Sequence, residues 1–126
     1  MTFEPINPAS LGRPSGFTHG MLGPAGGRVL FVAGQTAPEA GGFVGQWEQA
    51  LGRVLEVVRA AGGTPESIGR MTVFVTDRAS YLANLAPLGE VHRKAMDRHY
   101  PAMSLVEVRA LVDPQALVEI EATAVL

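Results

Sequence analysis

The apolar residues of this chain repeat with two different periods, and this switch constrains the fold more than any other feature. Within residues 70–76 and 118–126 they alternate, so every second side chain is on the same face, which is typical of a β-strand. From Gln46 onward the spacing changes to three and four residues, which is typical of the buried face of a helix. The residues of that helical stripe are Trp47, Leu51, Val54, Leu55 and Val58.

The N-terminal part of the chain is rich in Pro, Gly and Ser. Residues 1–16 are therefore expected to form an irregular N-terminal arm. A short strand within residues 17–22 is expected to form a hairpin with the compact apolar run at residues 28–33, which ends at Gly34.

The C-terminal half indicates further helical segments followed by two strands. A helical region begins after Asp77 and is divided by Pro87, which is favourable in the first turn of a second helix running to about His99. Strands are expected at residues 103–109 and 118–126. The complete order is ββαβαββ, which predicts an α+β fold with two helices on one face of a mixed sheet.

Size and composition narrow the class of protein. A chain of 126 residues is expected to form a single domain over residues 1–126. The formal charge of -2 disfavours nucleic acid as a partner, and the absence of cysteine excludes disulfides and thiolate nucleophiles. The longest apolar runs are strand-sized and no signal peptide is apparent, so we expect a cytoplasmic protein without a membrane partner.

One sheet face is expected to need a partner. Phe74 alternates with Met71, Val73 and Val75, so it is on the face of its strand opposite to theirs. A small domain with apolar groups on both sheet faces is expected to bury the second face by self-association. The sequence therefore predicts a homo-oligomer.

Four segments, in their order and spacing, resemble the Rid/YjgF family, the reactive intermediate deaminases that are also described as endoribonuclease L-PSP. These segments are Val32-Ala33-Gly34-Gln35, residues 72–77, residues 100–108 and residues 118–125. The resemblance extends from about Phe17 to the C-terminus. It implies a chorismate-mutase-like protomer in a homotrimer with a central β-barrel, with three ligand sites between neighbouring subunits.

The resemblance also implies a ligand site whose polar groups are altered here. Met103 stands where the deaminases have an arginine that binds the substrate carboxylate, and Phe17 and Ala33 stand where they have a tyrosine and a serine. The glutamate that helps to activate the attacking water corresponds to Glu119. Arginine binds a carboxylate through two hydrogen bonds and methionine has no donor. We therefore do not expect a standard 2-imino acid deaminase.

Three further residues complete the expected site. Gly34 belongs to one of the family segments, and the resemblance implies that the backbone carbonyl of Leu105 assists the glutamate. His19 follows Phe17 by two residues, so on a strand both would face the same cleft. A replacement cation from Arg13 or from a neighbouring subunit is an open alternative.

No cofactor or metal is expected. His92 and His99 are seven residues apart, which is two helical turns, but no carboxylate has a matching spacing.

Two functions stay open. One is hydrolysis or tautomerisation of an imine or enamine of a small metabolite through Glu119. The other is a non-catalytic trimer that binds a small molecule or a partner protein. In either function, the site is expected to prefer a neutral or cationic, partly apolar ligand.

Overall fold

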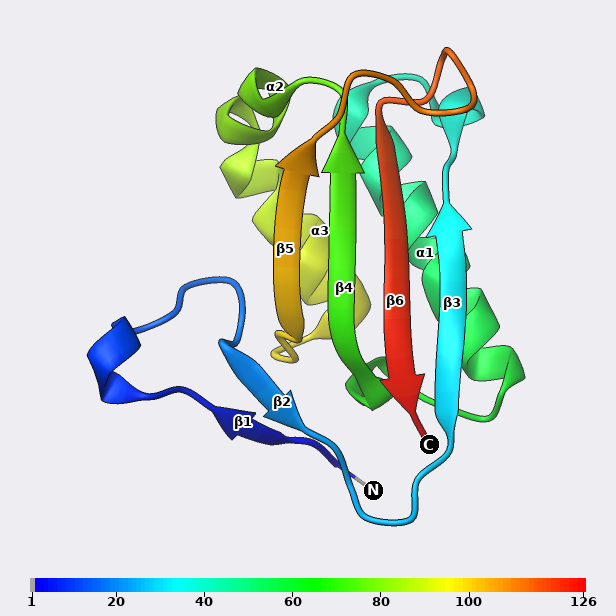
Figure 1. The fold of residues 1–126 in the computed structure, drawn as a ribbon. Helices are drawn as coiled ribbons and strands as arrows, with labels where there is room; N and C mark the ends of the chain where they lie inside the picture. Colours follow the sequence, from blue (N-terminus) through cyan, green and yellow to red (C-terminus); the bar gives the residue numbers. More distant parts are fainter. Residues whose placement is uncertain (1) are drawn as a thin grey trace.

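A four-stranded sheet organises the computed structural model, which describes residues 2–126 (Figure 1). The strand order is β3-β6-β4-β5. The bounds are β3 (Val29–Gln35), β6 (Val118–Val125), β4 (Ile68–Val75) and β5 (Ala102–Glu107). Strands β4 and β5 are parallel and the other neighbours are antiparallel, so the predicted mixed sheet is confirmed.

Helices lie behind this sheet in the view of Figure 1. They are α1 (Phe43–Ala60), α2 (Arg78–Ala83) and α3 (Leu85–Met96). Asp77 caps α2 by accepting a 3.0 Å hydrogen bond from the backbone N–H of Ala79, and Pro87 lies in the first turn of α3. The α+β architecture with helices on one sheet face is therefore as predicted.

The core lies between the helices and the sheet. On β4 the side chains of Met71, Val73 and Val75 are each at most 1% exposed, and register pairs Met71 with Ala122 and Val73 with Ile120. The apolar stripe of α1 covers this face, and its members are all buried. The apolar residues that alternate along the strands thus share one face of the sheet, and the chain's own helices cover that face.

The opposite face, which we call the open face, is not covered by any helix of residues 2–126. Phe31 of β3 is 80% exposed there, and its register partner on β6 is Thr123. Phe74 of β4 is paired with both Val106 and Glu119, so these three side chains share the open face.

The N-terminal expectations are partly wrong. The segment expected to be an irregular arm contains a strand, β1 (Glu4–Ile6), which pairs antiparallel with β2 (Gly20–Leu22). The hairpin expected between residues 17–22 and 28–33 is absent from the described residues, where β2 pairs with β1 and β3 pairs with the C-terminal strand β6.

Backbone hydrogen bonds explain this change of partner. Arg28 and Leu126 exchange two of them, at 2.7 and 2.9 Å, so the end of β6 binds the start of β3. A Cβ placed on Gly27 would lie 2.3 Å from Cγ1 of Val125, which shows how closely the chain passes this strand.

Within residues 2–126, no helix combines the length and the apolar character that crossing a bilayer requires.

Candidate functional site

Glu119 lies on the open face, directly over a bulge in β3. The register between β3 and β6 shifts between Val32 and Gln35, so Ala33 and Gly34 form an irregular step in the ladder. A Cβ on Gly34 would lie 2.7 Å from Cδ and 2.9 Å from Oε2 of Glu119. Glycine is therefore the residue that lets the glutamate side chain lie across β3. We call Ala33, Gly34 and Glu119 the carboxylate half of the site.

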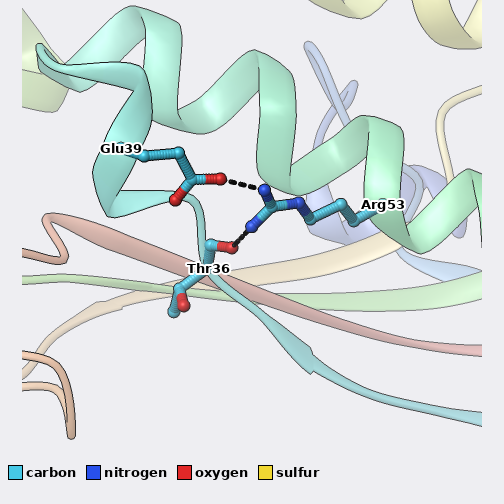
Figure 2. A network of polar contacts seen from close by, with 3 residues as sticks. All are labelled: Thr36, Glu39 and Arg53. Atoms are coloured by element: carbon cyan, nitrogen blue, oxygen red, sulfur yellow. Dashed lines mark hydrogen bonds and ion pairs between the residues drawn. The ribbon is translucent and has the colours of Figure 1, made fainter.

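A polar network fixes the chain just beyond this bulge (Figure 2). Arg53 of α1 donates to the backbone carbonyl of Thr36 and forms an ion pair with Glu39. Hydrogen bonds from its own backbone N–H and from Arg53 lower the pKa of Glu39. The network ties the segment after β3 to α1, and so supports the position of Gly34.

Met103 lies on the other face of the sheet. Its register partner is Met71, a core residue on the helix-covered face, and Met103 packs against the same core. Leu105 pairs with Val73 and also packs against the core, so the Leu105 side chain is directed away from Glu119. The resemblance implies that Leu105 assists Glu119, and in this structure only the backbone carbonyl of Leu105, and not its side chain, could do so.

The N-terminal loop is bound to the start of β5, beside Met103. Thr18 forms an isolated bridge with Ala102, and its backbone N–H donates to the carbonyl of Pro101 at 3.2 Å. The rings of Phe17 and His19 contact each other edge to face, with centroids 5.2 Å apart. Phe17 and Met103 thus lie on neighbouring segments, which we call the β5 half of the site.

His19 and Arg13 each line a hollow other than the cavity that Met103 lines. His19 lines a hollow of about 360 Å³ together with Arg70 and Thr123. Arg13 lines another hollow, with Asn7 and Gly12 among its neighbours. Neither residue lines the cavity that contains Met103.

That cavity, of about 500 Å³, lies between β5, the three helices and the N-terminal loop. Apolar and aromatic side chains make up most of its wall. Its residues are Ser15, Gly16, Trp47, Met71, Tyr81, Leu82, Leu85, Leu88, Gly89, His92, Tyr100 and Met103. The helical stripe predicted a core position for Trp47, which is confirmed, but no pattern predicted that Tyr81 and Tyr100 line a cavity. A signal was available, because Trp and Tyr combine an apolar ring with a polar atom and are enriched where both kinds of contact are made.

The two C-terminal histidines bind backbone carbonyls. Nε2 of His92 donates to the carbonyl of His99 at 2.8 Å, and Nε2 of His99 donates to the carbonyl of Ile68 at 2.6 Å. The expectation that both share one helix face is wrong, because α3 ends at Met96. The positive φ of 54° at Asp97 follows directly and turns the chain out of the helix.

The two halves of the expected site are apart in one protomer. Met103 and Glu119 lie on opposite faces, and β4 separates their strands, so two strand spacings of about 5 Å each lie between them. A cavity that contains both side chains therefore requires two copies of the chain.

Comparisons with known proteins agree with this fold. The family model for endoribonuclease L-PSP matches residues 15–126. TdcF of Escherichia coli K12, named as a reactive intermediate deaminase, is 36% identical over 108 residues, which cover 79% of this chain and 80% of TdcF.

Solved structures give the same result. The structure of YyfB from Yersinia pestis, described as a Rid family protein of unknown function, has a TM-score of 0.83 and 35% identity, with 100% of both chains covered. The structure of E. coli TdcF with bound serine has a TM-score of 0.63 and 32% identity, with 91% of each chain covered.

Proposed function

Because the chain belongs to the Rid/YjgF family, we propose that it hydrolyses the C=N bond of a small, uncharged imine at a site between two copies of the chain. The observation that carries this proposal is the position of Glu119 over Gly34. The carboxylate lies on an uncovered sheet face and is partly buried there by its own strand neighbours. A general acid or base needs this combination of a fixed position and access to water and substrate.

The arrangement of the two halves supports a cyclic assembly. The β5 half lies at one edge of the sheet, and the carboxylate half lies on β3 and β6 at the other edge. In a closed ring of heterologous contacts, the β5 half of one copy meets the carboxylate half of the next at every contact. A homotrimer with a central β-barrel would therefore complete one site between each pair of neighbouring subunits.

The exposed apolar residues of the open face support the same assembly. Val29, Phe31 and Val106 are all large, apolar and more than two-fifths exposed in the protomer. Packing of three open faces around a central axis would remove these side chains from water and stabilise the trimer.

The chemistry requires one carboxylate and one water. The Glu119 carboxylate accepts a proton from the water as the water oxygen forms a bond to the imine carbon, while the electron pair of the C=N π bond moves to the nitrogen, which takes up a proton from solvent. In the resulting carbinolamine Glu119 returns its proton to the nitrogen, the hydroxyl group releases its proton to solvent as the C=O bond forms, and the C–N bond breaks. The products are a carbonyl compound and ammonia, and Glu119 is again ionised.

Met103 supports the preference for an uncharged substrate. Its thioether carries no charge and no strong donor, at the position where the resemblance implies an arginine. Loss of a buried charged group that pairs with a carboxylate costs about 2–5 kcal/mol. A substrate without a carboxylate avoids this loss.

Replacement of Glu119 tests the proposal. Glu119→Gln is expected to lower the rate of ammonia release from a neutral imine by about 10²- to 10⁴-fold and to leave the trimer intact. Glu121→Gln, two residues along the same face of β6, is the matched control and is expected to keep its rate.

Two outcomes would overturn the proposal. One is an unchanged rate in Glu119→Gln. The other is a wild-type protein that consumes neither a neutral imine nor 2-iminopropionate while a ligand raises its melting temperature, which is the behaviour of a non-catalytic binding protein. Turnover of 2-iminopropionate in preference to a neutral imine would contradict the uncharged substrate.

A further inference from the structure

The cavity that Met103 lines is large, partly aromatic and without charged Arg, Lys, Asp or Glu side chains among its lining residues, and these three properties together indicate which ligand group it binds. We infer that it binds an aryl or bulky alkyl group of the substrate, so that the substrate is an imine with a large apolar substituent. The inference rests on the proposed function and defines the substrate class of that site.

Two pairs of stacked aromatic rings line the cavity. The rings of Trp47 and Tyr81 are stacked, with centroids 5.8 Å apart and planes 21° apart. The rings of His92 and Tyr100 are also stacked, at 4.6 Å and 9°. Flat aromatic surfaces bind another ring by stacking or by edge contacts, with about 0.5–1.5 kcal/mol beyond the burial of area.

The wall carries no charged side chain from Arg, Lys, Asp or Glu among its twelve residues. Burial lowers the pKa of His92, and this effect outweighs the hydrogen bond from Nε2–H to the carbonyl of His99, which raises the pKa. The imidazole is therefore neutral at physiological pH and does not attract a carboxylate into the cavity. A charged group would lose its hydration here without gaining an ionic partner.

The volume of the cavity is also large enough for a ring. An apolar cavity of about 150 Å³ already binds benzene. The cavity of about 500 Å³ has room for a ring and the short chain that joins it to a reacting carbon. Met103 lines it and belongs to the β5 half of the site, so the ring would lie next to the reaction.

Gly89 provides a way to fill the cavity. It lies on α3 in the cavity wall, and a Cβ there would meet no atom within 4 Å. Gly89→Leu is expected to place its side chain in the cavity without a clash, and to favour the helix because leucine is the better helix former. Gly52 of α1 also has no atom within 4 Å of a built Cβ and does not line the cavity, so Gly52→Leu is the matched control.

Trp47 makes the test direct, because it is the only tryptophan of the chain and lies in the wall. Its fluorescence is measured during titration with benzylacetone and acetone, two stable ketones that represent hydrolysed imines with and without a ring. Benzylacetone is expected to bind about tenfold more tightly than acetone or better. Gly89→Leu is expected to remove most of this advantage, and Gly52→Leu is expected to keep it.

Equal binding of both ketones by the wild-type protein would overturn the inference, as would undiminished binding of benzylacetone by Gly89→Leu. Urea unfolding of each variant establishes that it is folded, and Gly89→Ala, with its single added carbon, serves as a second variant. Phenylpyruvate, which adds a carboxylate to the ring, is expected to bind more weakly than benzylacetone.

The same titration in Glu119→Gln separates the inference from the proposed function. The inference predicts that benzylacetone still binds to this variant, because Glu119 does not line the cavity. If the variant keeps both this binding and full imine turnover, the proposed role of Glu119 fails and the apolar subsite stands. If the wild-type protein hydrolyses imines but shows no preference for the ring, the subsite fails and the proposed function stands.

Discussion

The two faces of the four-stranded sheet have the same pattern of alternating residues but different surroundings. On the helix-covered face, Val73 is 0% exposed, whereas Val106 on the open face of the neighbouring strand is 43% exposed. The difference arises because the chain supplies helices for only one face. Alternation thus identifies residues that share a face, but does not identify what covers that face.

The comparison also separates the two halves of the candidate site. The cavity beside Met103 is lined by the protomer's own helices, β5 and N-terminal loop and is partly open to solvent, whereas Glu119 lies on the sheet face that no helix of the described chain covers. One half is therefore built by folding, and we propose that the other is completed by assembly. The predictions below test this division, from the largest expected effect to the smallest.

The largest effect is expected on the assembly, from a charge on the open face. Phe31→Asp replaces an exposed phenyl group by a carboxylate at each of the proposed subunit contacts. If each contact loses about 2 kcal/mol of apolar burial, three contacts together lose enough to raise the trimer dissociation constant by about four orders of magnitude. Sedimentation analysis is expected to detect monomers.

Val112→Asp is the control for Phe31→Asp, because Val112 is 103% exposed in a loop outside the sheet. The same apolar-to-acidic change there is expected to leave the mass of the assembly unchanged. A Phe31→Asp protein with the wild-type mass would show that the open face is not the subunit contact.

The next effect is expected on the free energy of unfolding. The same substitution of valine by alanine is compared on the two faces of the sheet. Val73→Ala removes two methyl groups from the fully buried face and is expected to lower the free energy of unfolding by about 2–3 kcal/mol. Val106→Ala on the open face is expected to cost less than about 1 kcal/mol. Urea unfolding in the Phe31→Asp background measures both in the isolated protomer, and equal costs would contradict the division between the faces.

The sequence predicted the helix-covered face well, because the residue patterns that determine it are local. The α1 stripe and the alternation around Val73 and Ile120 each occur within one element, so their periods indicate which side chains are buried together. The resemblance supplied Met103 and Glu119 as site residues. Met103 and Glu119 lie on opposite faces because of the register of β5 against β4. This register pairs segments that are about thirty residues apart in the chain, so no local pattern predicts it.

A short strand within residues 17–22 was predicted and is present as β2, but the strand pairing and the cavity wall were missed, for related reasons. The pairing of β3 with β6 joins residues near the two ends of the chain, and no local turn signal encodes it. The aromatic wall combines Trp47, Tyr81 and His92 from three different helices, and a helical period describes only one helix at a time.

A smaller effect is expected at the bulge beneath Glu119. Gly34→Ala adds a carbon that would lie 2.7 Å from Cδ of Glu119, so the carboxylate must move. A displacement of about 1 Å can cost up to about 10²-fold in rate. We therefore expect a 10- to 100-fold lower rate of imine hydrolysis, with a binding affinity for benzylacetone like that of the wild type.

Gly52→Ala controls for the change of glycine to alanine, because its added carbon meets no atom within 4 Å. It is expected to hydrolyse imines at the wild-type rate. An unchanged rate in Gly34→Ala would show that the placement of the carboxylate over the bulge has no role in the reaction.

The smallest effect is expected in the pH dependence of stability, and it arises at His92 in the wall of the cavity beside Met103. Burial lowers the pKa of His92 below its ordinary value of 6.5, so the unfolded chain takes up a proton at a higher pH than the folded one. Between these two pKa values the unfolded state binds more protons, and stability therefore falls as the pH is lowered and is fully present above about pH 6.5. Phe in place of His92 keeps a ring against Tyr100 and removes the titrating group, so His92→Phe is expected to flatten the stability profile in the interval just below pH 6.5. The lowered pKa of Glu39 acts below its ordinary value of 4.5, outside this interval. Urea unfolding at several pH values measures both proteins, and parallel profiles would mean that the cavity wall accommodates a charged imidazole, which would also weaken the case for an uncharged ligand group there.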